Sequence, residues 1–449
     1  MNNSLNSFLF STPAMTRVFS AQSQLRAMMR FEWALSAALE SAGLAETGSS
    51  AAVEAFLDAD FVDSDALQQA ARENGNIAIP FVKQLTAAVK SKNEAASRSI
   101  HLGATSQDVL DTALVLQMRE AMPLLRESLQ RLEDALVLQI KAHAETMLSG
   151  RTWLQAGPPT TLGLKLAGTL AALRRGSDRL RAAAERACVL QFGGAVSTLS
   201  ALGDAGGIVS AELARRLQLR EPAIPWHTQR DSLAEIVEAL ALLTGSLAKF
   251  AGDIALLMQN EIGEAAESGD QSRGGSSTMP HKHNPVACAA VLAAHARMPA
   301  LAVTMLAAMP QQHERGLGLW QAEWETVPEA FRLTAGALSY SEEIARDLQV
   351  DAARMQSNLE ALLGLPQAEA VSVALAQKTG RAAAHDLLRD AAARAQRDKI
   401  HLGEVLKQMP EITRHLSGDE IDRLLDPRNY LGSAQRFIAQ VLGDADANR

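Results

Sequence analysis

Residues 268–285 read Ser-Gly-Asp-Gln-Ser-Arg-Gly-Gly-Ser-Ser-Thr-Met-Pro-His-Lys-His-Asn-Pro, and this segment separates two long stretches with helical apolar periodicity. Its glycines give the backbone freedom, and Pro280 and Pro285 stop it from continuing as a helix. A plain connection between packed helices needs only about two to eight residues. The segment is longer and rich in polar groups, so we predict a mobile lid over a ligand.

Apolar residues on both sides of this segment recur at helical spacing over long distances. The periodicity predicts helices over 16–42, from Asp111 onward, from Leu162 onward, over 232–262, near 286–309 and near 323–348. The helix that begins at Asp111 has a coiled-coil-like seam, and Pro123 inside it predicts a kink. No stretch shows convincing strand alternation, so the predicted fold class is all-α.

The sequence predicts three helical domains. Residues 1–110 would form an N-terminal helical domain, 111–363 a central bundle of long helices with the lid, and 364–449 a small C-terminal helical domain. A chain of 449 residues is too long for one small core. The central helices carry wider apolar faces than one neighbour covers, and such surfaces are usually buried by self-association.

The composition limits the classes of function. Apolar residues make up 47% of the chain and aromatic residues only 4%, which suits packed helices. A net charge of −8 argues against a nucleic-acid-binding or anionic-membrane-binding surface. Cys188 and Cys288 form no C-x-x-C motif, which indicates a reducing compartment. The N-terminus lacks the pattern of a signal peptide, and no run reaches eighteen apolar residues, so we expect a cytoplasmic protein without a membrane span.

Two further polar segments interrupt the helical pattern. Residues 103–108 read Gly-Ala-Thr-Ser-Gln-Asp, and residues 150–155 read Gly-Arg-Thr-Trp-Leu-Gln. Hydroxyl groups such as those in 103–108 suit a bound carboxylate, although Thr-Ser is also a common start of a helix. His281 and His283 could suggest a metal, but Lys282 between them and the absence of a carboxylate partner argue against one. We therefore expect no metal and no cofactor.

Residues 275–285 match the signature G-S-S-x-M-P-x-K-x-N-P and thereby resemble the fumarase/aspartase superfamily. The resemblance implies a homotetramer whose central helices pool into one superhelical bundle, with each active site built from loops of three subunits. It also implies that Ser276 transfers a proton at the carbon alpha to a carboxylate, while Lys282 and Asn284 bind that carboxylate. Loop amides and a cation near a serine favour its ionised form, which such a proton transfer requires.

Other segments resemble parts of the adenylosuccinate lyase-like branch of this superfamily. Residues 103–108 resemble its T-S-x-D element, residues 312–315 its H-E-R segment, and residues 229–231 another segment near the site. A solvated arginine at a helix end is the plain alternative for Arg315. The resemblance implies that substrate carboxylates are held by Thr105, Ser106, Arg315, His101, Arg151 and Gln155.

Residues 150–155 resemble the family element G-R-T-H-x-Q, with one difference. Trp153 stands where the family has a histidine that serves the leaving group, and Ala289 stands where a glutamate commonly supports that histidine. An amine or hydroxide needs an acid to depart, whereas a carboxylate, with a pKa of about 4, leaves or attacks without assistance. The joint change predicts a reaction whose nucleophile is a carboxylate.

One branch of the superfamily performs such a reaction. Residues 12–20, 150–155 and 316–324 resemble the branch that lactonises 3-carboxy-cis,cis-muconate in protocatechuate breakdown, the beta-ketoadipate pathway. The resemblance implies an intramolecular lyase acting on a small tricarboxylate, with Ser276 as the proton donor and Trp153 shaping the pocket. Two alternatives remain: an adenylosuccinate lyase-like β-elimination that releases fumarate, and a catalytically silent homologue kept as a structural protein.

Overall fold

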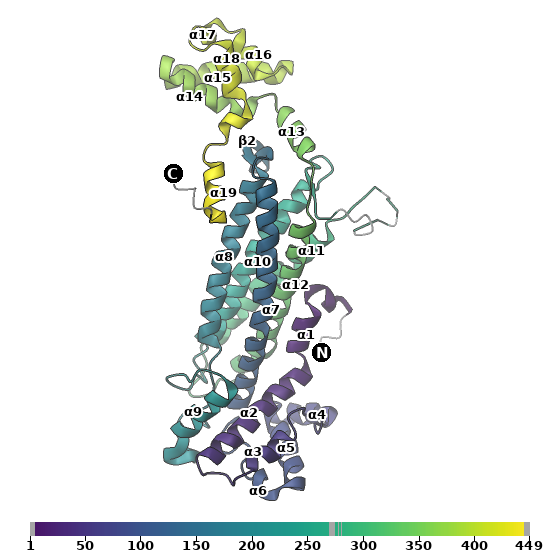
Figure 1. The fold of residues 1–449 in the computed structure, drawn as a ribbon, viewed down its shortest axis with the longest axis vertical. Helices are drawn as coiled ribbons and strands as arrows, with labels where there is room; N and C mark the ends of the chain where they lie inside the picture. Colours follow the sequence, from purple (N-terminus) through teal and green to yellow (C-terminus); the bar gives the residue numbers. More distant parts are fainter. Residues whose placement is uncertain (1–4, 269–273, 277, 280, 444–449) are drawn as a thin grey trace. The chain divides into compact units, whose positions relative to one another are not determined.

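The computed structural model describes residues 5–268, 274–276, 278–279 and 281–443 (Figure 1). Helices dominate these ranges and strands are few, which confirms the predicted all-α class. The chain divides into two compact units. The first comprises Met1–Leu129, Arg175–Gly245 and Ala293–Ser339, and the second comprises Gln130–Arg174, Ser246–Leu292 and Tyr340–Arg449. The division into three domains at 110 and 363 stays a prediction.

Among the described residues, five helices contribute residues to both units. They are α7 (Ser106–Ala142), α8 (Leu162–Ala187), α10 (Asp231–Leu257), α11 (Val286–Ala308) and α12 (Leu319–Asp347). Periodicity predicted all of them. The helix α7 begins before the predicted Asp111, because its polar first turn carries no apolar signal, and it continues through Pro123.

The predicted helix over 16–42 is two helices, α1 (Pro13–Val18) and α2 (Ala21–Ser41). Ser20 separates them with an extended backbone, and its side chain accepts a hydrogen bond of 3.2 Å from the N–H of Ser23. A serine in this position satisfies one of the free N–H groups of a helix start. Apolar spacing continues across the break, so periodicity alone could not show it.

In the first unit, α2 packs against α3 and α9. The core side of α2 is fully buried, with Met28, Met29, Phe31, Leu35 and Leu39 at 0% exposure. The remaining elements of this unit are short: η1 (Leu5–Phe10), α3 (Ser49–Glu54), α4 (Ser64–Asn74), α5 (Ala78–Lys92), α6 (Glu94–Ser97), η2 (Ser200–Ala205) and α9 (Gly206–Leu217).

The second unit contains a hairpin that the sequence did not predict. Strands β1 (Met147–Thr152) and β2 (Gln155–Thr161) pair antiparallel, and a bulge lies between Ser149 and Arg151. Glycines and prolines in these strands hide the strand pattern. Trp153 and Leu154 form the turn with φ of 55° and 62°, although such turns favour Asn-Gly. A second short pair joins β3 (Ala265–Ala266) to β4 (Gln349–Val350).

The C-terminal part of the second unit consists of short helices. In Figure 1, α14 to α18 gather in the green-to-yellow part of the chain, and they enclose an apolar cluster that includes Val371, Leu388, Leu406 and Ile421. The elements are α13 (Ala352–Glu360), η3 (Leu365–Gln367), α14 (Ala368–Thr379), α15 (Arg381–Asp398), α16 (Leu402–Lys407), α17 (Pro410–Thr413), α18 (Gly418–Leu425), η4 (Pro427–Tyr430) and α19 (Ala434–Leu442).

Two helices in the described part of the chain, α10 and α11, are long and apolar enough to cross a membrane by length and composition. Their most apolar windows have mean hydropathies of 1.5 and 1.6 and are 50% and 28% buried. Adding α13 and α14, which pass together across a bend of 73°, brings the total to three. These windows contain polar residues, so they are compatible with the observation that no run reaches eighteen continuous apolar residues.

Candidate active site

The start of α7 lies in the first unit and carries the predicted Thr-Ser pair. The N–H of Thr105 donates to Oδ2 of Asp108 over 3.0 Å, and the N–H of Asp108 donates to the carbonyl of Thr105. Gly103 precedes the pair with φ +77°, and a Cβ there would lie 2.6 Å from Cγ of Leu202. Thr105 and Ser106 thus stand at a helix N-terminus, where N–H groups and the helix dipole favour a carboxylate.

Asp108 also ties a second loop to this helix start. Its buried carboxylate accepts hydrogen bonds from the N–H groups of Gly193 and Gly194, at 3.0 and 2.9 Å, and from Nε2 of His227 at 2.7 Å. On the other side of the imidazole, Nδ1 lies 2.9 Å from Oγ of Ser197. Sequence reasoning missed both His227 and Ser197. The only signal was the family-like segment just after His227.

Arg315 lies beside this cluster. Its Nη1 donates to Oε1 of Gln107 over 2.7 Å, and its Nη2 donates to the carbonyl of Ala195 over 2.8 Å. Burial lowers the pKa of Arg315, while the charges of Asp108 and Asp111 raise it. The guanidinium is therefore fixed next to the α7 start rather than solvated at a helix end.

His101 precedes the same loop and pairs with a buried carboxylate. Its Nδ1 lies 2.7 Å from Oε1 of Glu32, and its backbone N–H donates to Oε2 of Glu32 over 2.9 Å. Burial alone would lower the pKa of His101, but the charge and the hydrogen bond of Glu32 outweigh it and raise this pKa. Glu32 thereby favours the cationic form of the imidazole close to the loop.

Arg230, from the third family-like segment, is inaccessible. It is 1% exposed, and its guanidinium binds Asp111 at 2.7 Å and Glu323 at 2.5 Å. Trp320 donates a further hydrogen bond of 3.0 Å to Asp111. Burial raises the pKa of Glu323, although Arg230 opposes this shift. Because the two carboxylates occupy its donors, Arg230 stabilises the residues around the start of α7 and does not itself contact a ligand.

The lid belongs to the second unit, and its two ends are bound to each other. Gly275 and His283 form an antiparallel bridge. The backbone N–H and the side-chain amide of Asn284 both donate to the carbonyl of Gly274, at 2.8 and 2.9 Å. Gly274 has φ +69°, a backbone conformation that suits glycine. The lid residues 269–273, Ser277 and Pro280 lie outside the described residues.

The predicted catalytic serine receives amide hydrogen bonds. Oγ of Ser276 accepts from the N–H of Met279 over 3.2 Å and from the N–H of Thr278 over 3.4 Å. Two amide donors favour negative charge on this oxygen. Lys282 is exposed in the same loop, and its backbone N–H donates to the carbonyl of Met279.

One buried carboxylate anchors the base of the lid. Glu267 is 4% exposed, and its two oxygens accept the N–H groups of Ala287 and Cys288, each over 2.9 Å. These N–H groups belong to the first turn of α11, where a negative charge is favourable. The start of the lid is therefore bound to the helix that follows it.

The hairpin carries the other three predicted residues. Arg151 forms two hydrogen bonds with Glu264, at 2.9 and 2.6 Å, and Glu264 is 0% exposed. Trp153 is 98% exposed at the tip, and Gln155 is exposed next to it. Arg151 is thus engaged within the fold, while Trp153 and Gln155 project from it.

The predicted residues fall into groups within each unit. The first unit brings together His101, Thr105, Ser106 and Arg315 around the start of α7. In the second unit, the lid holds Ser276, Lys282 and Asn284, and the hairpin holds Arg151, Trp153 and Gln155. Among the described residues, no group of His, Cys, Asp or Glu could hold a metal ion.

Comparison with known proteins identifies the family to which the chain is similar. A family model described as Lyase matches residues 7–299, and one described as Adenylosuccinate lyase C-terminus matches residues 364–441. The chain is 49% identical to a 3-carboxy-cis,cis-muconate cycloisomerase of Pseudomonas aeruginosa, over 99% of this chain and 97% of that protein. A protein of the same name from Acinetobacter baylyi is 42% identical over 97% of each chain.

Solved structures of proteins with the same kind of name are also similar to the chain. A crystal structure of 3-carboxy-cis,cis-muconate lactonizing enzyme from Pseudomonas putida matches with a TM-score of 0.93 and 48% identity, and 98% of each chain is covered. The chain therefore belongs to the lyase family known as the fumarase/aspartase superfamily, and within it to the branch of the 3-carboxy-cis,cis-muconate cycloisomerases.

Proposed function

We propose that this protein is a 3-carboxy-cis,cis-muconate cycloisomerase, an intramolecular lyase that forms 4-carboxymuconolactone in the beta-ketoadipate pathway. The observation that carries the proposal is its similarity to four relatives of that name, at 42% to 49% identity over 94% to 99% of this chain. Trp153 and Ala289, where other superfamily members carry the histidine and its glutamate, support the same reaction.

The chemistry needs one new C–O bond and one new C–H bond. A substrate carboxylate attacks one carbon of a double bond, and the π electrons then take up a proton at the carbon alpha to another carboxylate. The attacking group is an anion near neutral pH and needs no base. One proton is consumed in each turnover, because a carboxylate becomes an ester and a C–H bond forms.

Ser276 delivers this proton, directly or through water. Its two amide hydrogen bonds and the nearby Lys282 favour the alkoxide that remains after the transfer. Lys282 and Asn284 hold the carboxylate that receives the negative charge. Asn284 uses its side-chain amide on Gly274 and keeps its carbonyl and a second N–H hydrogen for other contacts.

The other substrate carboxylates are held at the start of α7. Arg315 supplies positive charge there, and His101, whose pKa is raised by Glu32, adds to it when protonated. Thr105 and Ser106 supply hydroxyl groups at the helix N-terminus. A small tricarboxylate requires such local cations, because the chain as a whole carries a charge of −8. Trp153 shapes the pocket in place of the family's histidine.

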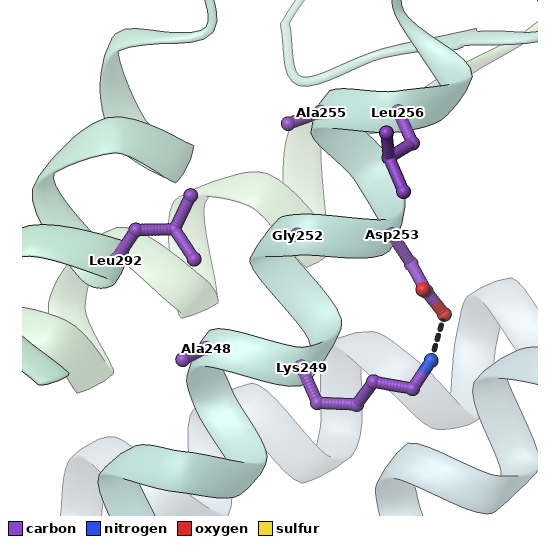
Figure 2. A pocket seen from close by; sticks show the side chains of 7 residues that line it. All are labelled: Ala248, Lys249, Gly252, Asp253, Ala255, Leu256 and Leu292. Carbon is purple, nitrogen blue, oxygen red and sulfur yellow. Dashed lines mark hydrogen bonds and ion pairs between the residues drawn. The ribbon is translucent and has the colours of Figure 1, made fainter. Parts of the chain in front are cut away.

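The protein is a homotetramer with shared active sites, and it is cytoplasmic. Support comes from apolar side chains left exposed on α10 and α11, among them Leu242, Leu256, Val303 and Leu306. An open groove of about 440 Å³ is lined by Ala248, Gly252, Ala255, Leu256 and Leu292. Figure 2 shows these residues together with Lys249, which pairs with Asp253. Small residues of this kind let another helix approach closely. Helices from further copies cover these faces.

An ultraviolet assay with 3-carboxy-cis,cis-muconate tests the function directly. Ring closure removes the conjugated diene, so we expect its absorbance to fall when the protein is added. Adenylosuccinate is the comparison substrate. Rapid release of fumarate from it, without loss of the muconate absorbance, would replace the proposal by the β-elimination alternative, and turnover of neither substrate would indicate a silent homologue.

A further inference from the structure

Three side chains in the first unit form a continuous hydrogen-bonded chain. Oγ of Ser197 lies 2.9 Å from Nδ1 of His227, and Nε2 of His227 lies 2.7 Å from Oδ1 of Asp108. His227 and Asp108 are buried, while Ser197 is half-buried and forms the accessible end. A serine, an imidazole and a carboxylate in this order form a proton-transfer arrangement known from unrelated enzymes.

The buried end of the chain fixes the orientation of the imidazole. Asp108 accepts N–H groups from Thr105, Gly193 and Gly194 in addition to the His227 ring. Since a carboxylate accepts hydrogen bonds, Nε2 of His227 carries a hydrogen and donates it to Asp108. The other ring nitrogen, Nδ1, therefore faces Ser197 as an acceptor for its hydroxyl hydrogen.

The accessible end is held in an unfavourable backbone conformation. Ser197 has φ +62°, in the left-handed region that few residues other than glycine adopt. Strained backbone conformations of this kind cluster at functional sites. Arg315 holds the same loop through the carbonyls of Gly194 and Ala195, at 3.4 and 2.8 Å. Arg315 thus holds the loop that carries Ser197, at a carbonyl two residues before the serine.

We propose that Ser197 is a further catalytic residue, whose hydroxyl donates to a substrate carboxylate beside Arg315, with His227 and Asp108 as its positioning residues. The inference rests on the proposed cycloisomerase function. Ring closure moves negative charge from the attacking carboxylate to the carboxylate conjugated with the double bond. A donor aimed at developing charge stabilises the transition state.

No proton changes its atom in this step. As the C–O bond forms, the O–H of Ser197 turns from Nδ1 of His227 to the charged carboxylate oxygen and donates a hydrogen bond to it. Ser276 supplies the single proton, to the carbon, and the O–H of Ser197 then returns to Nδ1. The guanidinium of Arg230 lies 3.5 Å from the backbone carbonyl of His227 rather than from its ring.

Substitution of Ser197 tests the catalytic role. For Ser197→Ala and Ser197→Gly we expect kcat to fall by about 100-fold or more, with KM changed by less than about threefold. Glycine suits the left-handed backbone, so Ser197→Gly should fold at least as well as the wild type, and a lower kcat cannot be ascribed to misfolding. Ser200→Ala, an exposed hydroxyl close by, is the matched control and should keep kcat. A kcat of Ser197→Gly within about threefold of wild type overturns the inference.

Two further variants separate hydrogen-bond donation from loop positioning. Ser197→Cys keeps a hydrogen-bond donor, so it should be at least about tenfold faster than Ser197→Ala. His227→Gln should lower kcat, and the double variant Ser197→Ala/His227→Gln should be no slower than Ser197→Ala alone, because both changes break one chain. Cysteine no better than alanine, or losses that multiply, would reduce Ser197 to a structural residue. No turnover by the wild type would instead overturn the cycloisomerase function and this inference with it.

Discussion

Ser276 differs from an ordinary surface serine in its two amide hydrogen bonds. For Ser276→Ala we expect turnover to fall by about 100-fold or more, because the substrate carbon loses its proton donor. Substrate binding and assembly should stay nearly intact, since the loop is closed by other contacts. Steady-state kinetics, ligand titration and sedimentation measure the three properties. Near-normal kcat would remove Ser276 from its role, and Thr413→Ala, an exposed hydroxyl in α17, serves as the control.

Arg151 pairs with a fully buried carboxylate, so its removal leaves Glu264 without a counter-charge. We expect Arg151→Gln to lower the free energy of unfolding by about 3 kcal/mol, as measured by urea denaturation. The double variant Arg151→Gln/Glu264→Gln should recover part of this loss, because no buried charge remains. Unchanged stability together with a raised KM would show that Arg151 binds substrate instead.

Some site residues could be predicted from the sequence, and others could not. Thr105, Ser106 and Arg315 stand in recognisable segments, and the structure brings them to the start of one helix. Ser197 and His227 stand in segments without such a match, and they meet only because the loop folds back onto Asp108. Contacts between distant segments of this kind leave no periodic or spacing signal in a single sequence.

Among the elements, the loop before α7 has a built-in pH dependence. The pKa of His101 is raised by Glu32, so the stability that this pair provides is fully present below about pH 6.5, the ordinary histidine pKa, and is lost as the pH rises through the higher folded value. We expect the wild type to lose more stability than His101→Gln between about pH 6 and pH 9. Urea denaturation at both values measures this, and parallel losses would contradict it.

Arg230, the residue before α10, joins α7 to α12 within the first unit through Asp111 and Glu323. Arg230→Met would leave both carboxylates buried without a cation, and we expect a loss of about 3–5 kcal/mol in unfolding free energy. Burial already raises the pKa of Glu323, so acidification should protonate it and shrink the loss. Arg346→Met removes an exposed ion pair and should change little. A loss that grows on acidification would refute this account.

Long helices were the most predictable elements, and the hairpin was the least. The apolar stripe of α10 repeats over many turns, so local errors average out. The strands β1 and β2 are short and contain Gly150, Gly157, Pro158 and Pro159, residues that normally argue against a strand. Their pairing depends on contacts between the two segments, which neither segment shows by itself.

For the whole molecule, the exposed apolar faces of α10 and α11 predict the assembly. Leu256 is 40% exposed and lines the groove in Figure 2. We expect Leu256→Glu to shift the protein from tetramer to smaller species in sedimentation velocity, because a charge would be buried between copies. Val373→Glu, on α14 outside α10 and α11, is the control. A tetramer that survives Leu256→Glu at low concentration would place the interface elsewhere.

Periodicity showed that the long helices carry surplus apolar surface, but not what covers it. One face of a helix looks the same in sequence whether a neighbouring helix, a second copy or lipid lies on it. The family resemblance supplied the tetramer, and the exposed side chains on α10 and α11 agree with that expectation without identifying the partner. Boundaries between domains are equally hard to read, because α7, α8, α10, α11 and α12 pass through both compact units.

The hairpin tip sets a limit on how far this protein can be made more robust. Its two turn residues, Trp153 and Leu154, are bulky and hold a backbone shape that Asn-Gly would adopt with less strain. An engineer seeking heat resistance would exchange them first. If the indole lines the pocket as proposed, that exchange raises the stability of the fold and lowers the catalytic activity. Stability and turnover are therefore in conflict at the hairpin tip.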